Sequence, residues 1–218
     1  MHVILINGSP RQSGNTAIAL EWMADELRRE GITTETIQLG DQIIRGCIAC
    51  EHCGTSQDNL CAFNNDGIND LIRKLRQADG FVIGSPTYFG GMAGTLKSAM
   101  DRLFYAGRRN GGYRNKVGAA AVAVRRGGGP ATFNQIITYY HLAEMVVAPS
   151  QTWAVGYGRE KGEISQDAEG RQTICRHANA MAWIIKMMEA AKDSVALPQA
   201  ADRIMMNFIR PRAHETSR

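Results

Sequence analysis

Hydrophobic positions along this 218-residue chain follow a repeated strand-then-helix rhythm. Short apolar runs, typical of strands buried on both faces, alternate with longer segments whose apolar residues recur at helical spacing. Between residues 15 and 30, for example, one apolar stripe consists of Leu20, Met23, Ala24 and Leu27. The pattern predicts strands at 2–7, 33–39, 81–84, 117–124 and 145–155, and helices at 15–30, 66–77, 94–105, 131–144 and 168–191.

Strands that alternate with helices predict a parallel sheet with helices on both faces and right-handed crossovers. A chain of this length is expected to form one α/β domain, which we place at residues 1–192. Residues 193–218 form a C-terminal extension. Its apolar residues predict packing on this subunit or contact with a neighbouring copy; they are Ile204, Met205, Met206, Phe208 and Ile209.

The loop after the first predicted strand is rich in hydrogen-bond donors. It reads N-G-S-P-R-Q-S-G-N-T over residues 7–16, just before a helix. Donor side chains, a guanidinium and the amides of a helix N-terminus together suit a phosphate monoester, and an ordinary polar loop is the alternative. Neither the lysine of a P-loop nor a G-x-G-x-x-G fingerprint is present. The predicted phosphate ligands are Ser9, Arg11, Ser13, Asn15 and Thr16.

Two further loops follow the third and fourth predicted strands. The carboxyl ends of parallel strands share one edge of the sheet, where ligands bind in such folds. The segment 85–92 offers hydrogen bonds, aromatic surface and close backbone approach to a planar heterocycle, through Pro86, Thr87, Tyr88, Phe89 and Gly90. The segment 125–129 is a flexible glycine loop. A phosphate loop and a loop for an aromatic plane on one rim predict FMN as the ligand.

Charge and hydropathy narrow the partners and the compartment. The net charge is +4, and residues 197–218 contribute half of it, so the chain lacks the basic stripe of a nucleic-acid-binding protein. No apolar run reaches the roughly 18 residues that a membrane span requires. No signal-peptide pattern opens the sequence. We therefore expect a cytoplasmic protein with reduced cysteines and without a membrane partner.

Four cysteines stand close together in a cysteine-rich loop at 45–63, which follows the second predicted strand. Cys47, Cys50, Cys53 and Cys61 have the spacing C-x2-C-x2-C-x7-C. Three cysteines at two-residue gaps can wrap one face of a [4Fe–4S] cluster, and the fourth can close it. Zinc and four free thiols are the alternatives. The last gap is longer than in ferredoxins, and Ala62 stands where they have proline, so the spacing leaves the choice open.

Three segments resemble the NADPH-dependent FMN reductase family: I-N-G-S-P-R-x-x-G-N-T at 6–16, A-D-G-x-x-x-G-S-P-T-Y-F-G at 78–90 and L-K-x-x-x-D-R at 96–102. The cysteine loop is similar to the iron–sulfur flavoprotein branch of that family. The resemblance implies a flavodoxin-like three-layer sandwich, with a five-stranded parallel sheet in the order 2-1-3-4-5, and a homodimer or dimer of dimers. It also implies FMN phosphate at 9–16, isoalloxazine against 86–90, and a third flavin loop formed by Gly127, Gly128 and Gly129.

Two functions follow as hypotheses. The first is an FMN-dependent oxidoreductase that takes electrons from NAD(P)H and passes them to a quinone, a nitro or azo compound, a flavin or a similar acceptor. The second is an iron–sulfur flavoprotein or flavodoxin-like electron carrier that serves a protein partner. The flavin carries the chemistry in both, so no catalytic side chain is named. Lys97 and Asp101 read as a surface ion pair, and Arg102 as a structural residue.

Overall fold

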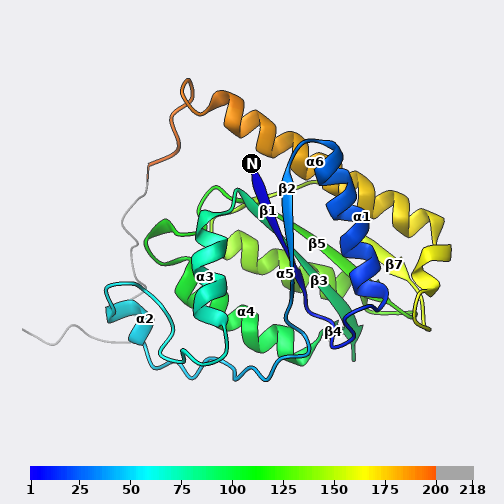
Figure 1. Ribbon diagram of the computed structural model, residues 1–218, viewed down its shortest axis with the longest axis horizontal. Helices are drawn as coiled ribbons and strands as arrows, with labels where there is room; N and C mark the ends of the chain where they lie inside the picture. The colour runs from blue at the N-terminus through cyan, green and yellow to red at the C-terminus, as the bar shows by residue number, and fades with distance from the viewer. Residues whose placement is uncertain (200–218) are drawn as a thin grey trace, which may run out of the picture.

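The sheet has the parallel arrangement that the sequence predicts. The structure is a computed structural model that describes residues 1–199, so the apolar run at 204–209 lies outside the described residues and its packing stays a prediction. The strand order is β2-β1-β3-β5-β6, which corresponds to 2-1-3-4-5 among the main strands (Figure 1). These strands are β1 (His2–Asn7), β2 (Thr33–Gln38), β3 (Gly80–Tyr88), β5 (Val117–Val124) and β6 (Val146–Val147).

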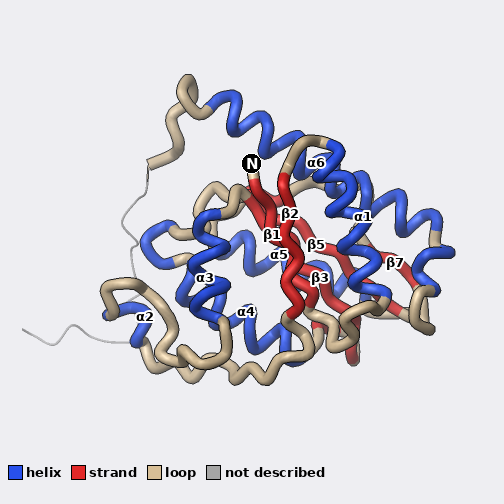
Figure 2. The backbone as a smooth tube through the Cα atoms, in the orientation of Figure 1, coloured by secondary structure: helices blue, strands red, loops and turns tan. Residues whose placement is uncertain are grey.

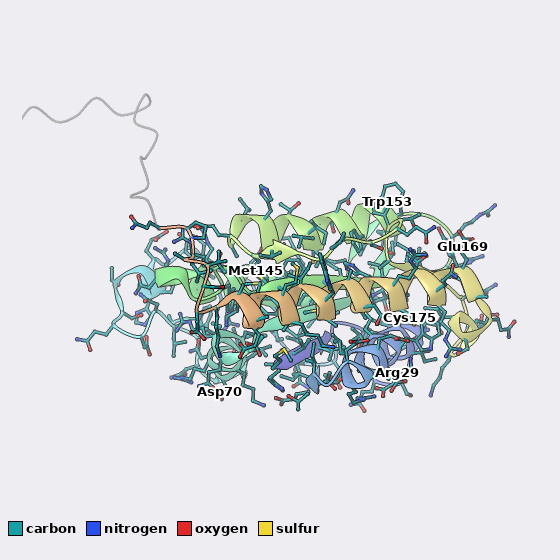
Figure 3. All side chains as sticks on the ribbon, turned by 90° about the horizontal axis from the view of Figure 1, so that it is seen from above. Arg29, Asp70, Met145, Trp153, Glu169 and Cys175 are labelled. Carbon is teal, nitrogen blue, oxygen red and sulfur yellow. The ribbon has the colours of Figure 1, made fainter. Side chains whose placement is uncertain are left out.

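Helices cover both faces of this sheet. One face carries α1 (Asn15–Arg29) and α6 (Ala168–Ala191), and the other carries α3 (Ile68–Gln77), α4 (Gly94–Gly107) and α5 (Gly129–Leu142). Seen from above, α1, which bears Arg29, and α5 lie on opposite sides of the strands (Figure 3).

Alternation along β3 explains the two layers. Gly84 closely approaches Leu20 of α1, whereas Phe81 points the other way and packs edge-on against Tyr140 of α5. Successive side chains of a strand face opposite sides, so a strand buried on both faces must be apolar throughout. The result is the flavodoxin-like α/β/α sandwich that the resemblance implies. In the described part of the chain, no helix has the length and apolar character to cross a bilayer.

The predicted fifth strand at 145–155 is wrong in its extent. Two short strands replace it, β6 and β7 (Val155–Tyr157), and each pairs with β5 in parallel. Between them, Ala120 of β5 donates its N–H to Nε2 of His177 at 3.2 Å instead of to a strand. Nδ1 of His177 therefore carries the proton, which it donates to the carbonyl of Pro149 at 3.1 Å. Pro149 lacks an N–H group and cannot extend the ladder.

The third strand is longer than predicted. The loop prediction for Pro86, Thr87 and Tyr88 is wrong, because β3 continues through them to form a hairpin with β4 (Gly91–Met92). Ser85 and Pro86 still have register partners in β5, so β3 stays in the sheet beyond Gly84. Short elements complete the described chain: α2 (His52–Thr55) and the 3-10 helices η1 (Arg109–Gly111) and η2 (Glu163–Gln166).

Candidate functional site

The predicted phosphate loop lies at the point where the strand order reverses, between β1 and β3, where ligands bind in such sheets. Gly8 donates its N–H to the carbonyl of Gly84 at 2.8 Å, so the loop leaves the sheet beside β3. Arg11 and Ser13 are exposed. Gly14 occupies the N-cap of α1, and no side chain caps that helix. The amide groups of the first turn are therefore placed to receive an anion.

Not all of the predicted phosphate ligands have free side chains. The Asn15 amide donates to the carbonyl of Glu160 at 3.0 Å and accepts the N–H of Gly162 at 2.8 Å. Ser9 is buried, and its hydroxyl oxygen accepts the N–H of Arg11 at 3.1 Å. Thr16 is buried as well. The side chains of Asn15 and Ser9 shape the loop, which leaves Arg11 and Ser13 as the exposed donors.

The predicted isoalloxazine loop is a tight β-hairpin. Tyr88 pairs with Gly91, and the two residues between them have positive φ: 48° at Phe89 and 80° at Gly90. Positive φ at both central residues is the pattern of a type I′ turn. This conformation is strained for a bulky residue such as Phe89, whose side chain is fully exposed. The turn holds an aromatic ring out in solvent at the rim.

The glycine loop fixes this hairpin to the start of α5. Gly128 has φ +89°, and a Cβ added there would lie 2.9 Å from Cα of Gly90. The hydroxyl oxygens of Thr87 and Thr132 lie 3.0 Å apart across the same contact. Gly129 is buried against Val155. Two of the three predicted glycines therefore serve packing, and Gly127 is the exposed one.

The cysteine loop runs from the end of β2 to α3, off the sheet, and is mostly irregular (Figure 2). Cys47, Cys50, Cys53 and Cys61 all line one cavity of about 20 Å³. In the described chain, no three cysteine, histidine or acidic side chains converge closely enough for a single metal ion. Four thiols that line one shared space are the donor set that an iron–sulfur cluster takes from a protein.

Metal binding at this loop would be coupled to proton release. Burial raises the pKa of the Cys53 thiol, although the nearby charge of Arg109 opposes the shift. Thiols bind iron as thiolates, so this proton must leave when a metal arrives.

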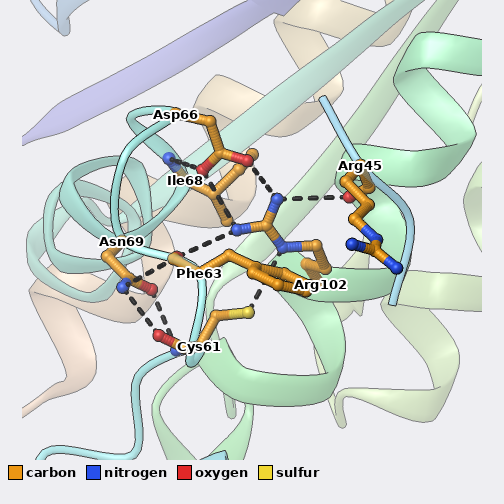
Figure 4. Close-up of polar contacts among 7 residues, drawn as sticks. All are labelled: Arg45, Cys61, Phe63, Asp66, Ile68, Asn69 and Arg102. Atoms are coloured by element: carbon orange, nitrogen blue, oxygen red, sulfur yellow. Dashed lines mark hydrogen bonds and ion pairs between the residues drawn. The ribbon is translucent and has the colours of Figure 1, made fainter. Parts of the chain in front are cut away.

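Arg102 of α4 joins the cysteine loop to the body of the domain (Figure 4). Its side chain is fully buried, and it forms an ion pair with Asp66. Nε donates to Sγ of Cys61 at 3.2 Å. The terminal nitrogens donate to both carboxylate oxygens of Asp66 and to the carbonyls of Arg45 and Phe63. Burial disfavours the charged guanidinium and so lowers its pKa, but the hydrogen bonds to Asp66 and Cys61 outweigh burial and raise the pKa of Arg102 above its ordinary value.

A second arginine, which sequence reasoning missed, anchors the same loop. Arg76 of α3 donates to the carbonyls of Asp58 at 2.9 Å and Asn59 at 3.2 Å. It also donates to the carbonyls of Ala106 and Gly107 at the end of α4. For Arg102 a signal was present, because an arginine at helical spacing between the small residues at 99 and 106 interrupts a buried face. Arg76 stands near the end of its helix and has no such signal.

Comparison with known proteins gives related sequences along most of the chain. Residues 1–160 match the NADPH-dependent FMN reductase family. An iron–sulfur flavoprotein of Methanocaldococcus jannaschii is 34% identical over 196 residues, which cover 87% of this chain and all of that protein. An iron–sulfur flavoprotein of Methanosarcina thermophila is 27% identical and covers 88% of this chain and all of its own length. An NADPH azoreductase of a Bacillus strain is 27% identical over 78% of this chain and 85% of its own.

Comparison of structures supports the fold. RosB, solved with a bound 8-demethyl-8-formylriboflavin-5'-phosphate intermediate, aligns with a TM-score of 0.70 at 15% identity, over all of this chain and 98% of its own. A flavodoxin from the domain Archaea aligns with a TM-score of 0.57 at 16% identity, over 85% of this chain and 99% of its own. At these identities the likeness concerns the fold alone.

Proposed function

This chain belongs to the NADPH-dependent FMN reductase family, and we propose that within this family it is an iron–sulfur flavoprotein that carries electrons for a protein partner. At the level of the family it is a flavin-binding redox protein. The proposal adds a [4Fe–4S] cluster on the four loop cysteines and a delivery role. A single observation carries it: all four thiols line one cavity, beside a helix that starts at the flavin rim.

The exposed donors of the rim support the FMN part of the proposal. Arg11, Ser13 and the first amides of α1 would bind the phosphate, because a helix N-terminus and a guanidinium both favour a dianion. The β3–β4 hairpin would receive the isoalloxazine edge, with Tyr88 and Phe89 as aromatic surface. Gly128 keeps this hairpin close to the start of α5.

The geometry of α4 supports a path between the two sites. This helix begins at Gly94, two residues after the hairpin strand β4, and carries Arg102 eight residues further on. At 1.5 Å per residue the two positions are about 12 Å apart along the axis. When bound, FMN supplies two-electron hydride chemistry and an iron–sulfur cluster supplies one-electron transfer. The start of α4 thus follows the hairpin that would receive the flavin, and Arg102 of the same helix bonds Cys61 of the cysteine loop.

The names of the relatives favour the carrier over the small-molecule reductase. The relatives with the higher coverage are iron–sulfur flavoproteins, and this chain has the four cysteines for such a cluster. Reduction of a small acceptor with NAD(P)H is the second candidate function. Its support is the family description and the 27% identity to an azoreductase.

Anaerobic reconstitution of the full chain with FMN, iron and sulfide tests the proposal. We expect a broad absorbance beneath the flavin bands and about four irons per chain. Cys50→Ala should lose the broad absorbance and the iron, and it should keep FMN. Cys175→Ala is the matched control, because that cysteine lies on α6, outside the cavity. A wild-type chain that binds FMN but no iron would remove the cluster from the proposal.

Kinetics separate the two functions. If the protein is a carrier, NADPH should reduce its flavin slowly, and a quinone or azo dye should be turned over poorly. Rapid steady-state NADPH oxidation with such an acceptor, unchanged in Cys50→Ala, would favour the reductase and contradict the carrier.

A further inference from the structure

We propose that Arg102 is the residue that positions Cys61 as the fourth cluster ligand, and that its Nε–H raises the reduction potential of the cluster through a charged hydrogen bond to that sulfur. The inference rests on the proposed function, in which the loop cysteines hold a cluster. It assigns to one side chain both the closure of the ligand set and part of its redox tuning.

The Arg102 guanidinium forms all of its hydrogen bonds with the cysteine loop and with Asp66, which follows that loop. Each of its five N–H groups has one partner: the Cys61 sulfur, two carboxylate oxygens and two carbonyls. The carbonyls belong to Arg45, ahead of the first cysteine, and to Phe63, just after the last. Arg102 therefore closes the loop by binding both of its ends. A lysine has three donors and lacks the planar fork, so it cannot reproduce this arrangement.

Cys61 is held from two sides. Its N–H and its carbonyl both bond the Asn69 side chain of α3, each at 2.9 Å. With the backbone fixed by Asn69 and the sulfur by Arg102, the side chain has a defined direction into the cavity. Cys47 and Cys50 are exposed by contrast. Seven residues separate Cys53 from Cys61, so the local sequence does not by itself bring Cys61 to the other three cysteines. The bonds from Asn69 and Arg102 hold it there.

The electrostatics of this contact favour a reduced cluster. Asp66 binds both terminal nitrogens of the guanidinium, which leaves Nε directed at the sulfur. Hydrogen bonds to ligand sulfurs stabilise the added negative charge of the reduced state and raise the potential. The arginine is buried, so water does not screen this bond as it would at the surface.

Arg102→Gln in the reconstituted full chain tests the proposal, with Arg76→Gln as the matched control. Arg76 anchors the same loop through carbonyl oxygens and bonds no sulfur. Potentiometric titration of the cluster should show a fall of about tenfold in the reduction equilibrium for Arg102→Gln, about 59 mV for one electron. Arg76→Gln should leave the potential unchanged, and both variants should keep FMN.

The remaining outcomes decide between this proposal and its premise. An unchanged potential in a fully loaded Arg102→Gln protein, or an equal shift in both variants, would overturn it. Loss of iron from Arg102→Gln alone would support the positioning role. If the wild type takes up no iron, the cluster fails as a premise, and hydrogen exchange of the metal-free chain then tests the contact itself. Residues 60–66 should exchange faster in Arg102→Gln than in Arg76→Gln; equal rates would overturn the contact.

Discussion

The rim loops at the carboxyl ends of β1, β3 and β5 and the cysteine loop are held in place by different means. The rim loops follow strands of the sheet, and backbone contacts fix them: the Gly8 N–H bonds the carbonyl of Gly84, and Gly128 packs against Gly90. The cysteine loop at 45–63 lies off the sheet, and two arginines from helices bind its carbonyls. The rim loops leave their charged hydrogen-bond donors exposed, whereas the carbonyls of the cysteine loop accept the hydrogen bonds of both arginines.

This difference has a physical reason. Strands bring their own hydrogen-bond ladder, so a loop at a strand end needs few side chains to define its path and can offer them to a ligand. An irregular loop over the body of the domain has backbone groups without a ladder, and buried ones must find partners. Arg102 and Arg76 are those partners. We expect rim substitutions to weaken binding and loop substitutions to weaken folding.

Arg11→Ala combined with Ser13→Ala should have the largest effect, confined to FMN binding. Each lost bond to a charged phosphate costs about 1.5–3 kcal/mol, so together they cost roughly 3–6 kcal/mol of binding. Fluorescence titration of apoprotein with FMN measures the dissociation constant. Both side chains are exposed, and the free energy of unfolding of the apoprotein should hardly change. Full flavin retention would contradict the phosphate assignment.

Asp66→Ala should have the next largest effect, on folding. It leaves the buried Arg102 without its counter-charge, which typically costs 3–5 kcal/mol. Asp70→Ala is the control, because Asp70 pairs with Arg73 at the surface and its loss should cost at most about 1 kcal/mol. Urea unfolding of the apoproteins measures both. Equal losses would mean that the loop does not depend on its buried pair.

Gly128→Ala should have an intermediate effect, both on FMN binding and on the free energy of unfolding. A left-handed backbone costs an L-residue about 1–2 kcal/mol, and here the new methyl also meets the hairpin. Gly31→Ala is the control: its φ is +79°, a Cβ there would have no neighbour within 4 Å, and it lies at the end of α1 away from the phosphate loop. Both variants should unfold more readily. Only Gly128→Ala should also bind FMN more weakly, and a similar affinity in the two variants would mean that this glycine does not support the flavin-binding hairpin.

The smallest effect concerns His177 and pH. Burial lowers the pKa of the His177 imidazole, although the bond from Nδ1 to the carbonyl of Pro149 opposes the shift. Only the neutral ring can accept the N–H of Ala120 at Nε2. As pH falls, the imidazole is protonated in the unfolded chain before it is protonated in the folded chain. Its contribution to stability is therefore present above the unfolded pKa of about 6.5 and is lost as pH falls below that value. Urea midpoints at pH 7.5 and 5.5 measure the loss. His177→Gln should be less stable at both values and less sensitive to pH, and an equal dependence would contradict the assignment.

Local pattern along the sequence determined the alternation of strands and helices, the order of the main strands through the resemblance, the loops after β1 and β5 and the cysteine spacing. The local pattern predicts these features because burial of one face imposes a period of 2 residues on strands and 3.6 residues on helices. Tertiary structure decided the rest. Cys61 meets Arg102 across 41 residues, and Ala120 meets His177 across 57. A bond between positions so far apart leaves no period in the sequence, so only the folded chain brings its partners together.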